Sequence, residues 1–143
     1  MTDYKFSVTL FISHPVIKGE EISSALKLDP VHCNNVGEIK KTKKGILVSE
    51  KNYETKWSYY PHGKERLCAD DITLEDYLVK LNNQLSIHSE YFSKIVQTGG
   101  YIEYFIGWFG GDYSMIVSLE PNLLKTTANL NIAIGLDVYP KEE

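Results

Sequence analysis

The stretch LEDYLVKLNNQLSIHSEYFSKIVQ, residues 74–97, carries the strongest structural signal in the chain. Its apolar positions step by four and three residues, which is the spacing of a helix with one apolar stripe. The stripe consists of Leu74, Leu78, Leu81, Leu85, His88, Phe92 and Ile95. Thr73 before it is a good N-cap, and Gly99 after it is a typical helix end. We therefore expect one long helix over about residues 74–97, bent near Asn82-Asn83 or Ser86.

This stripe needs an apolar partner, and the segments on either side of it predict a sheet. Residues 4–12 and 130–138 alternate apolar and polar side chains, as half-buried strands do. Residues 101–109 are apolar on both faces, which is typical of a central strand. Docking of the helix on the sheet is the interpretation we adopt, and a coiled coil between two copies is the alternative.

Weaker patterns complete the expected order. Aromatic residues at 55–60 and alternation at 113–119 predict two further strands, with Gly110-Gly111-Asp112 as a turn. Residues 36–39 and 46–48 are expected to form a hairpin, and residues 18–27 and 121–128 short helices. The predicted fold is one α+β domain over residues 1–143, in the order β-α-β-β-α-β-β-α-β. A mainly antiparallel sheet would carry one long and two short helices on one face.

Composition indicates a soluble globular protein. The chain has 143 residues, 43% of them hydrophobic and 24% charged, with a net charge of −4. No run approaches the roughly 20 apolar residues that a membrane helix needs. The N-terminal residues lack the basic and apolar regions of a signal peptide, so we expect a cytoplasmic protein without membrane contact.

Residues with catalytic or metal-binding potential are sparse and badly spaced. The sequence has no GxSxG, HExxH, GxxxxGK[ST] or GxGxxG motif in a suitable context. Cys33 and Cys68 lack metal-ligand spacing and are expected to be reduced. We therefore predict no catalytic residue, no metal and no cofactor, which favours a protein that is not an enzyme.

Two groups of residues are candidates for binding. The run Lys40-Lys41-Thr42-Lys43-Lys44 predicts a basic loop tip, in which Lys41 and Lys43 could contact phosphate or steer an acidic protein. Nucleic-acid binding is disfavoured by the pI of about 5.6, because dedicated domains usually exceed about 9.

The second group is aromatic. Tyr, Phe and Trp make up 12% of the chain, and such side chains are enriched at protein interfaces. A sheet covered on one side leaves its other face open, so we expect an exposed aromatic patch there. Its candidate members, with a neighbouring carboxylate, are Trp57, Tyr59, Trp108, Tyr139 and Asp137.

Several short motifs together resemble an uncharacterised bacterial family known only as a domain of unknown function. They are W-S-Y at 57–59, L-E-D at 74–76, G-W-F at 107–109 and L-D-V-Y-P at 136–140. The resemblance spans nearly the whole chain and implies a compact α+β single domain of similar length. It implies no catalytic residue.

These observations favour a non-enzymatic domain that binds a protein, with an immunity protein that neutralises a bacterial toxin as the leading hypothesis. One alternative is a small-molecule-binding or enzymatic domain with a cleft near Trp57, Trp108 and Asp137. The other is a nucleic-acid-associated regulator that uses the Lys40–Lys44 loop. The oligomeric state is not predicted.

Overall fold

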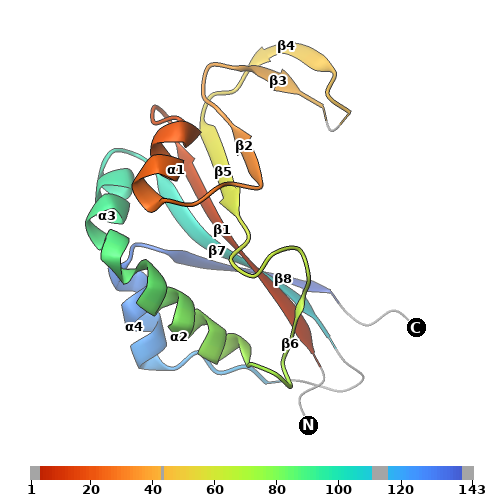
Figure 1. Ribbon diagram of the computed structural model, residues 1–143, viewed down its shortest axis with the longest axis vertical. Coiled ribbons are helices and arrows are strands. Elements are labelled where there is room, and N and C mark those ends of the chain that lie inside the picture. The colour runs from red at the N-terminus through yellow and green to blue at the C-terminus, as the bar shows by residue number, and fades with distance from the viewer. Residues whose placement is uncertain (1–3, 43, 111–115, 140–143) are drawn as a thin grey trace.

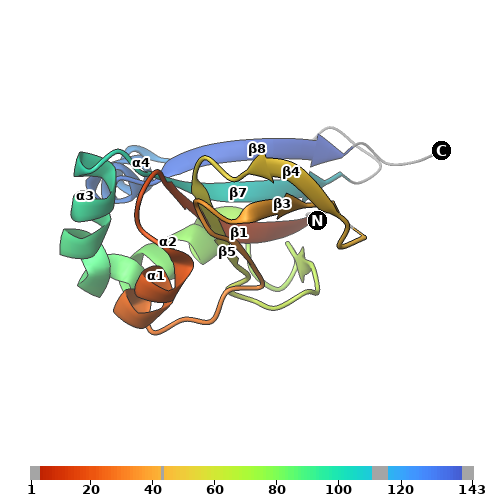
Figure 2. The same cartoon turned by 90° about the horizontal axis from the view of Figure 1, so that it is seen from above.

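The computed structural model describes residues 4–42, 44–110 and 116–139. In it, the predicted α+β fold is confirmed: a mainly antiparallel sheet carries helices on one side (Figures 1 and 2). The strands are β1 (Lys5–His14), β2 (His32–Asn34), β3 (Ile39–Lys41), β4 (Leu47–Lys51), β5 (Thr55–Tyr59), β6 (Leu67–Cys68), β7 (Tyr101–Phe109) and β8 (Ala133–Tyr139). The helices are α1 (Gly19–Leu26), α2 (Leu74–Leu85), η1 (Ser86–His88), α3 (Ser89–Gln97) and α4 (Pro121–Asn129).

The main sheet has the order β2-β5-β1-β7-β8, and β6 pairs with β1 beyond the end of β5. Every pairing in it is antiparallel except β7 with β8, which is parallel. β3 and β4 form a separate hairpin that extends from one end of the sheet (Figure 1). β7 therefore has a paired strand on each side, β1 and β8, as predicted for residues 101–109.

The predicted long helix is confirmed as the unbroken succession of α2, η1 and α3 over residues 74–97. The Thr73 hydroxyl accepts a hydrogen bond from the backbone N–H of Asp76, which caps the first turn. The predicted bend at Ser86 is where the helix narrows to a 3-10 turn. Its stripe is buried against the sheet at Leu74, Leu78, Leu81, Leu85, Phe92 and Ile95, with His88 half-buried.

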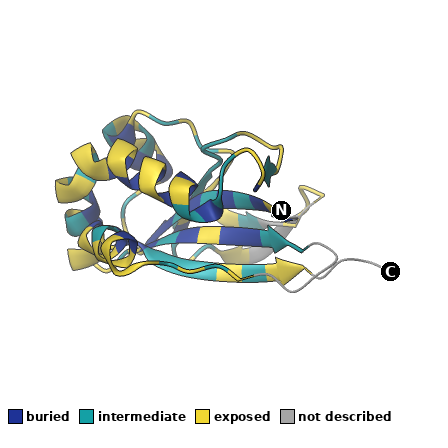
Figure 3. Cartoon of the chain, turned by 90° about the horizontal axis from the view of Figure 1, so that it is seen from below, coloured by how far each residue is buried: buried dark blue, intermediate teal, exposed yellow. Residues whose placement is uncertain are grey.

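Figure 3 shows the helices with buried inner and exposed outer faces, as amphipathic packing requires. The sheet contributes alternate residues to this core, because side chains of a strand point to opposite faces. The buried sheet residues include Phe6, Val8, Leu10, Ile12, Trp57, Ile102, Tyr104 and Ile106.

The predicted strand at residues 113–119 is not found where the structure describes it. Residues 116–120 are not in a strand, and residues 111–115, including the predicted turn at Gly111-Asp112, lie outside the described residues. The physical reason is that β8 takes the place beside β7, and a parallel neighbour requires a crossover connection. Val117 and Leu119 in this connection pack half-buried against the core.

The apolar side chains of residues 130–138 are expected to be buried under the helices, and Leu136 is not. Ile132 is buried, but Leu136 is 54% exposed although it lies on the same face. β8 is the outer strand of the sheet, so its far half extends beyond the helical layer.

A buried polar network ties the long helix to β7 and α4. The Asn82 side chain accepts from the Tyr104 hydroxyl at 2.8 Å and donates to the Thr127 hydroxyl at 2.9 Å. Asn82→Ala would leave the buried Tyr104 hydroxyl without its acceptor, so we expect a loss of about 1–3 kcal/mol in the free energy of unfolding. Urea denaturation measures this, and the exposed neighbour Asn83→Ala is the matched control. Equal effects of the two variants would contradict the role of the network.

Candidate protein-binding face

The two aromatic residues predicted on β5 lie on the helix-covered face, not on the open one. Trp57 pairs with Ile12 and Tyr59 with Leu10, both buried, so the two rings point toward the helices. Trp57 is 0% exposed, and its indole N–H donates to the Ser23 hydroxyl of α1 at 3.0 Å. Trp57 is therefore a core residue, and Tyr59 is half-buried beside it.

Trp108 also lies on the helix side of the sheet. It pairs with Phe6 across β1, is half-buried, and stacks on Tyr4 with ring centroids 4.6 Å apart. Asp137 pairs with Gly107 in the next strand and so lies on the opposite face. The sheet separates Asp137 from Trp57 and Trp108, and the three residues do not line one cleft.

The open face carries a different set of aromatic side chains. β7 presents Tyr101, Phe105 and Phe109 there, because these residues alternate with the buried ones. Phe11 of β1 and Tyr139 of β8 lie on the same face, by their register with Glu103 and Phe109. We call these five residues the open-face aromatics. Tyr101, Phe105 and Tyr139 are each more than 40% exposed.

One end of this face is a stacked cluster. The Tyr139 and Phe109 rings are nearly parallel, with centroids 4.9 Å apart, and the Arg66 guanidinium lies 3.4 Å from the centroid of Phe109. The Tyr139 hydroxyl donates to the Asp137 carboxylate, and this bond raises the pKa of Tyr139 above its ordinary value. Cation–π and stacking contacts pre-order these side chains without burying them.

Gly107 makes room for this cluster. A Cβ atom at Gly107 would lie 2.7 Å from the Ser7 hydroxyl and 3.1 Å from the Phe109 ring. Because glycine has no side chain there, the Phe109 ring can lie close to the sheet.

The centre of the face is hollowed. A depression of about 270 Å³ is lined by Thr9, Phe11, Ser58, Glu103 and Phe105. The Tyr101 hydroxyl donates to the Glu103 carboxylate, and this bond raises the pKa of Tyr101. Gly135 lies beneath that carboxylate, since a Cβ there would be 3.0 Å from its oxygens. The depression is thus mostly apolar and has one carboxylate at its wall.

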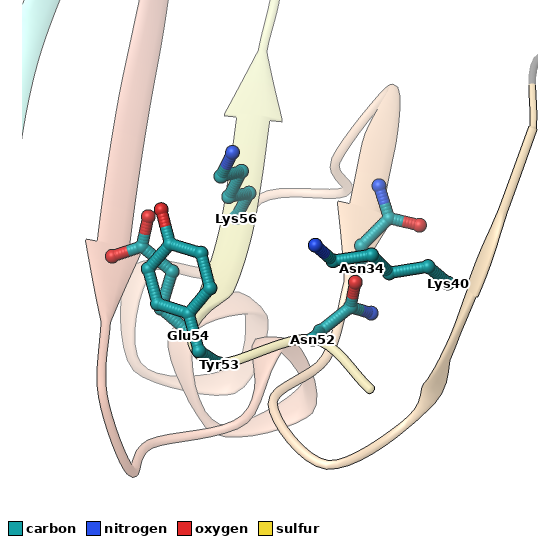
Figure 4. Close-up of a pocket in the computed structure, with 6 residues that line it drawn as sticks. All are labelled: Asn34, Lys40, Asn52, Tyr53, Glu54 and Lys56. Carbon is teal, nitrogen blue, oxygen red and sulfur yellow. The ribbon is translucent and has the colours of Figure 1, made fainter. Parts of the chain in front are cut away.

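A second, polar hollow of about 210 Å³ lies where the β3–β4 hairpin leaves the sheet (Figure 4). It is lined by Asn34, Lys40, Asn52, Tyr53, Glu54 and Lys56. The Lys40 ammonium is paired with Glu50 at 3.2 Å and lies 5.8 Å from the Tyr53 ring centroid, so its charge is already compensated. Glu54 adds a carboxylate to the lining (Figure 4).

The basic loop tip is only partly as predicted. Lys40 and Lys41 belong to strand β3, and Lys44 is exposed in the turn that follows. Lys43 lies outside the described residues, and so does the side chain of Lys41. A cationic patch formed by Lys41 and Lys43 therefore remains a prediction.

The two most enclosed histidines hold backbone groups with their ring nitrogens. His14 Nδ1 accepts from the N–H groups of Val16 and Ile17, and its Nε2 lies 2.7 Å from the Thr98 hydroxyl. His62 Nε2 accepts from the N–H of Val8 at 3.0 Å. Burial lowers the pKa of both His14 and His62. Both rings are therefore neutral structural acceptors near pH 7.

The described residues contain no group of three or more His, Cys, Asp or Glu side chains arranged to hold a metal ion. None of their helices is both long enough and apolar enough to cross a membrane. Cys33 and Cys68 are both free thiols.

Sequence reasoning missed four of the open-face aromatics as binding candidates: the exposed Tyr101 and Phe105 and the half-buried Phe11 and Phe109. The sequence did contain a signal for the three of these residues on β7. Residues 101–109 are apolar on both faces, and helices were expected to cover only one face of the sheet. We instead favoured Trp and Tyr as interface residues, and this selected two tryptophans that lie on the helix side of the sheet.

Fold and site together define an α+β domain with a one-sided helical layer and an open, aromatic sheet face. The family described as a domain of unknown function (DUF4279) matches residues 3–141, and the chain belongs to this family. No curated protein and no solved structure matched the chain.

Proposed function

We propose that the chain is a non-enzymatic domain that binds another protein through its open sheet face. The observation that carries the proposal is the row of open-face aromatics, which none of the described helices covers. Tyr101 and Phe105 are 45% and 43% exposed on the open face of β7, whereas the solvated face of an antiparallel sheet ordinarily carries polar side chains. Contiguous exposed apolar surface on a folded protein commonly marks an interaction site.

The chemistry of the face indicates what kind of protein surface fits it. The central depression accepts an aliphatic or aromatic side chain between Phe11 and Phe105. The Glu103 carboxylate at its wall favours an adjacent Lys or Arg. The net charge of −4 would also speed the approach of a basic partner. We therefore propose a partner with a basic surface that presents one apolar anchor.

A bacterial toxin is the partner we propose, which would make the chain an immunity protein of the cytoplasm. Small size, acidity and a pre-ordered aromatic face suit a protein whose task is to occupy and block another protein. The histidines support a binding role over acid–base catalysis, because ring nitrogens of His14 and His62 already accept hydrogen bonds from backbone N–H groups. Asp137 is similarly engaged by the Tyr139 hydroxyl.

Phe105 lines the depression that we propose holds the apolar side chain of the toxin. Shortening this residue should abolish protection against the toxin while the fold is retained. We expect Phe105→Ser to weaken partner binding by about 30-fold or more, as loss of a central aromatic contact of about 2 kcal/mol does. The test co-expresses the chain with the product of the gene adjacent to its own and follows growth. Titration calorimetry of the two purified proteins then measures the affinity.

Val79→Ser is the matched control, because Val79 is 44% exposed but lies on α2, on the other side of the sheet. Wild type and Val79→Ser should rescue growth, and Phe105→Ser should not. If Phe105→Ser binds as tightly as wild type, the open face is not the interface. If the adjacent gene product neither arrests growth nor binds the chain, the immunity role is wrong.

A further inference from the structure

β8 is an unprotected edge of the sheet. Within the described part of the chain it pairs only with β7, along seven residues. Its side chains Leu136 and Val138 are 54% and 61% exposed. The strand sequence AIGLDVY contains one charge, no lysine and no proline, whereas natural edges usually carry such residues to block further pairing.

The backbone of β8 shows which of its groups face outward. The Tyr139 carbonyl accepts from the N–H of Gly110, on the β7 side. Because successive residues of a strand direct their N–H and C=O groups to alternate sides, Ile134, Leu136 and Val138 direct theirs away from β7. Three residues thus offer six hydrogen-bonding groups at the edge.

We propose that two copies of this chain associate by antiparallel pairing of their β8 strands, about a two-fold axis at Leu136. The two sheets then become one continuous sheet, with both helical layers on one side and both open faces on the other. This surface is separate from the depression around Phe105, and the proposal does not depend on the function proposed above.

The side chains fit this register. On the helix side, Leu136 faces Leu136 of the second copy, and Ile134 faces Val138, so all contacts are apolar. On the open side, Tyr139 faces Ala133, and Asp137 faces Gly135, a small residue over which the Glu103 carboxylate of the same copy lies. Facing pairs of this kind stabilise antiparallel strands.

Charge also selects the register. If the two open faces lie on the same side of the joined sheet, each residue must pair with one whose side chain points to the same face. The nearest alternative registers are therefore centred on Gly135 or on Asp137. Centring on Asp137 would place two carboxylates directly opposite each other, which is destabilising. Centring on Gly135 would leave Val138 beyond the paired region of the second β8. Only the register at Leu136 pairs all three outward-facing residues.

The size of the seam sets the expected affinity. A strand of seven residues is about 23 Å long, and pairing along it buries less than the roughly 800 Å² per partner of a standard stable interface. We therefore expect a dissociation constant in the range of about 1–100 μM, typical of a small interface.

Sedimentation equilibrium of the purified chain from about 5 to 500 μM tests the dimer, since this range brackets that affinity. Leu136→Lys would set two ammonium groups opposite each other and should leave only monomer. Leu124→Lys is the matched control, because Leu124 is 45% exposed but belongs to helix α4 and not to strand β8. It should dimerise as wild type does.

Cross-linking tests the register itself. In the proposed pairing the two Leu136 Cα atoms lie about 5.5 Å apart, within reach of a disulfide. The two Val138 Cα atoms are separated by four residues along the seam, or about 13 Å. Under mild oxidation Leu136→Cys should form a covalent dimer whose linked peptide contains residue 136 twice, and Val138→Cys should not.

Val138 is the more exposed of the two positions, so cross-linking by random collision would favour Val138→Cys. A chain that is monomeric at about 500 μM would overturn the proposal, because that concentration exceeds the expected dissociation constant. A dimer that persists in Leu136→Lys would also overturn it. Leu136→Lys changes the edge but leaves Phe105 and the open face intact. Measuring whether this variant still binds the partner therefore distinguishes failure of the dimer proposal from failure of the open-face function.

Discussion

Trp57→Ala should lower the free energy of unfolding by about 3–5 kcal/mol, as truncation of a buried Trp does. The indole is 0% exposed between β5 and α1, and its N–H is satisfied by the Ser23 hydroxyl. Removing the indole leaves a large cavity and takes away the hydrogen-bond donor of Ser23 in α1. Urea denaturation followed by circular dichroism measures the change in the midpoint.

Two further variants help to separate the contributions of packing and of the hydrogen bond to the free energy of unfolding. Trp57→Phe keeps an aromatic ring but loses the bond to Ser23, so its cost should be smaller than that of the alanine variant. Trp108→Ala removes a half-buried ring that stacks on Tyr4 and should cost less than Trp57→Ala. A loss below about 1 kcal/mol in Trp57→Ala would contradict the core role, because buried Trp truncations exceed that value.

Acidification should destabilise the fold through His14 and His62. In the folded chain, burial lowers the pKa of each imidazole below the ordinary value of about 6.5. Protonation would also convert His14 Nδ1 and His62 Nε2 from acceptors to donors, against the N–H groups that they now accept. The neutral forms are therefore part of the folded structure.

The direction follows from linkage. Between the folded and unfolded pKa values the unfolded chain binds more protons, so the free energy of unfolding rises with pH there. The stabilisation is complete above about pH 6.5 and is lost as the pH falls from that value toward the folded pKa values. Each histidine contributes a slope of at most about 1.4 kcal/mol per pH unit.

Other charges modify this response. Glu21 and Lys94 act on His14 with opposite signs, raising and lowering its pKa respectively. The half-buried His88 has a pKa lowered by burial and by Lys27, and it adds a slope in the same direction.

Non-titrating acceptors should flatten the pH dependence. Asn at position 14 places its side-chain oxygen near the position of Nδ1, and Gln at position 62 places its oxygen near that of Nε2. We expect the variant His14→Asn/His62→Gln to show a shallower fall in stability between about pH 6.5 and 5 than wild type, because two of the titrating rings are gone. Urea melts at several pH values provide the slopes. Identical slopes in wild type and variant would contradict the assignment to these rings.

The aromatic face shows how far residue patterns could lead to a candidate site. Alternation along β5 indicates that Trp57 and Tyr59 share a face, but it does not indicate which face of the sheet that is. Only pairing with Ile12 and Leu10 decides that the two rings point toward the helices. Asp137 and Tyr139 are two residues apart on one strand and therefore share a face, but only the placement of that strand shows that this is the open face.

By itself the sequence determined the elements whose signal is local: the long helix at residues 74–97, the first strand and the central strand at residues 101–109. Periodicity of 3.6 or 2 residues and capping by Thr73 depend only on neighbours in the chain. Only the tertiary structure decided that β8 runs parallel to β7. This pairing depends on contacts between two strands that are joined by a connection containing α4, and such contacts are not local in the sequence.

Tertiary structure likewise decided that His62 accepts a hydrogen bond from the N–H of Val8, on strand β1 between its pairings with β5 and β6. The sequence of a strand shows the alternation of its side chains. It does not show which strand or which side chain forms hydrogen bonds with the backbone groups at its edge. Those choices follow from the free energy of the whole packed sheet, because a hydrogen bond between distant residues forms only when the core brings both together.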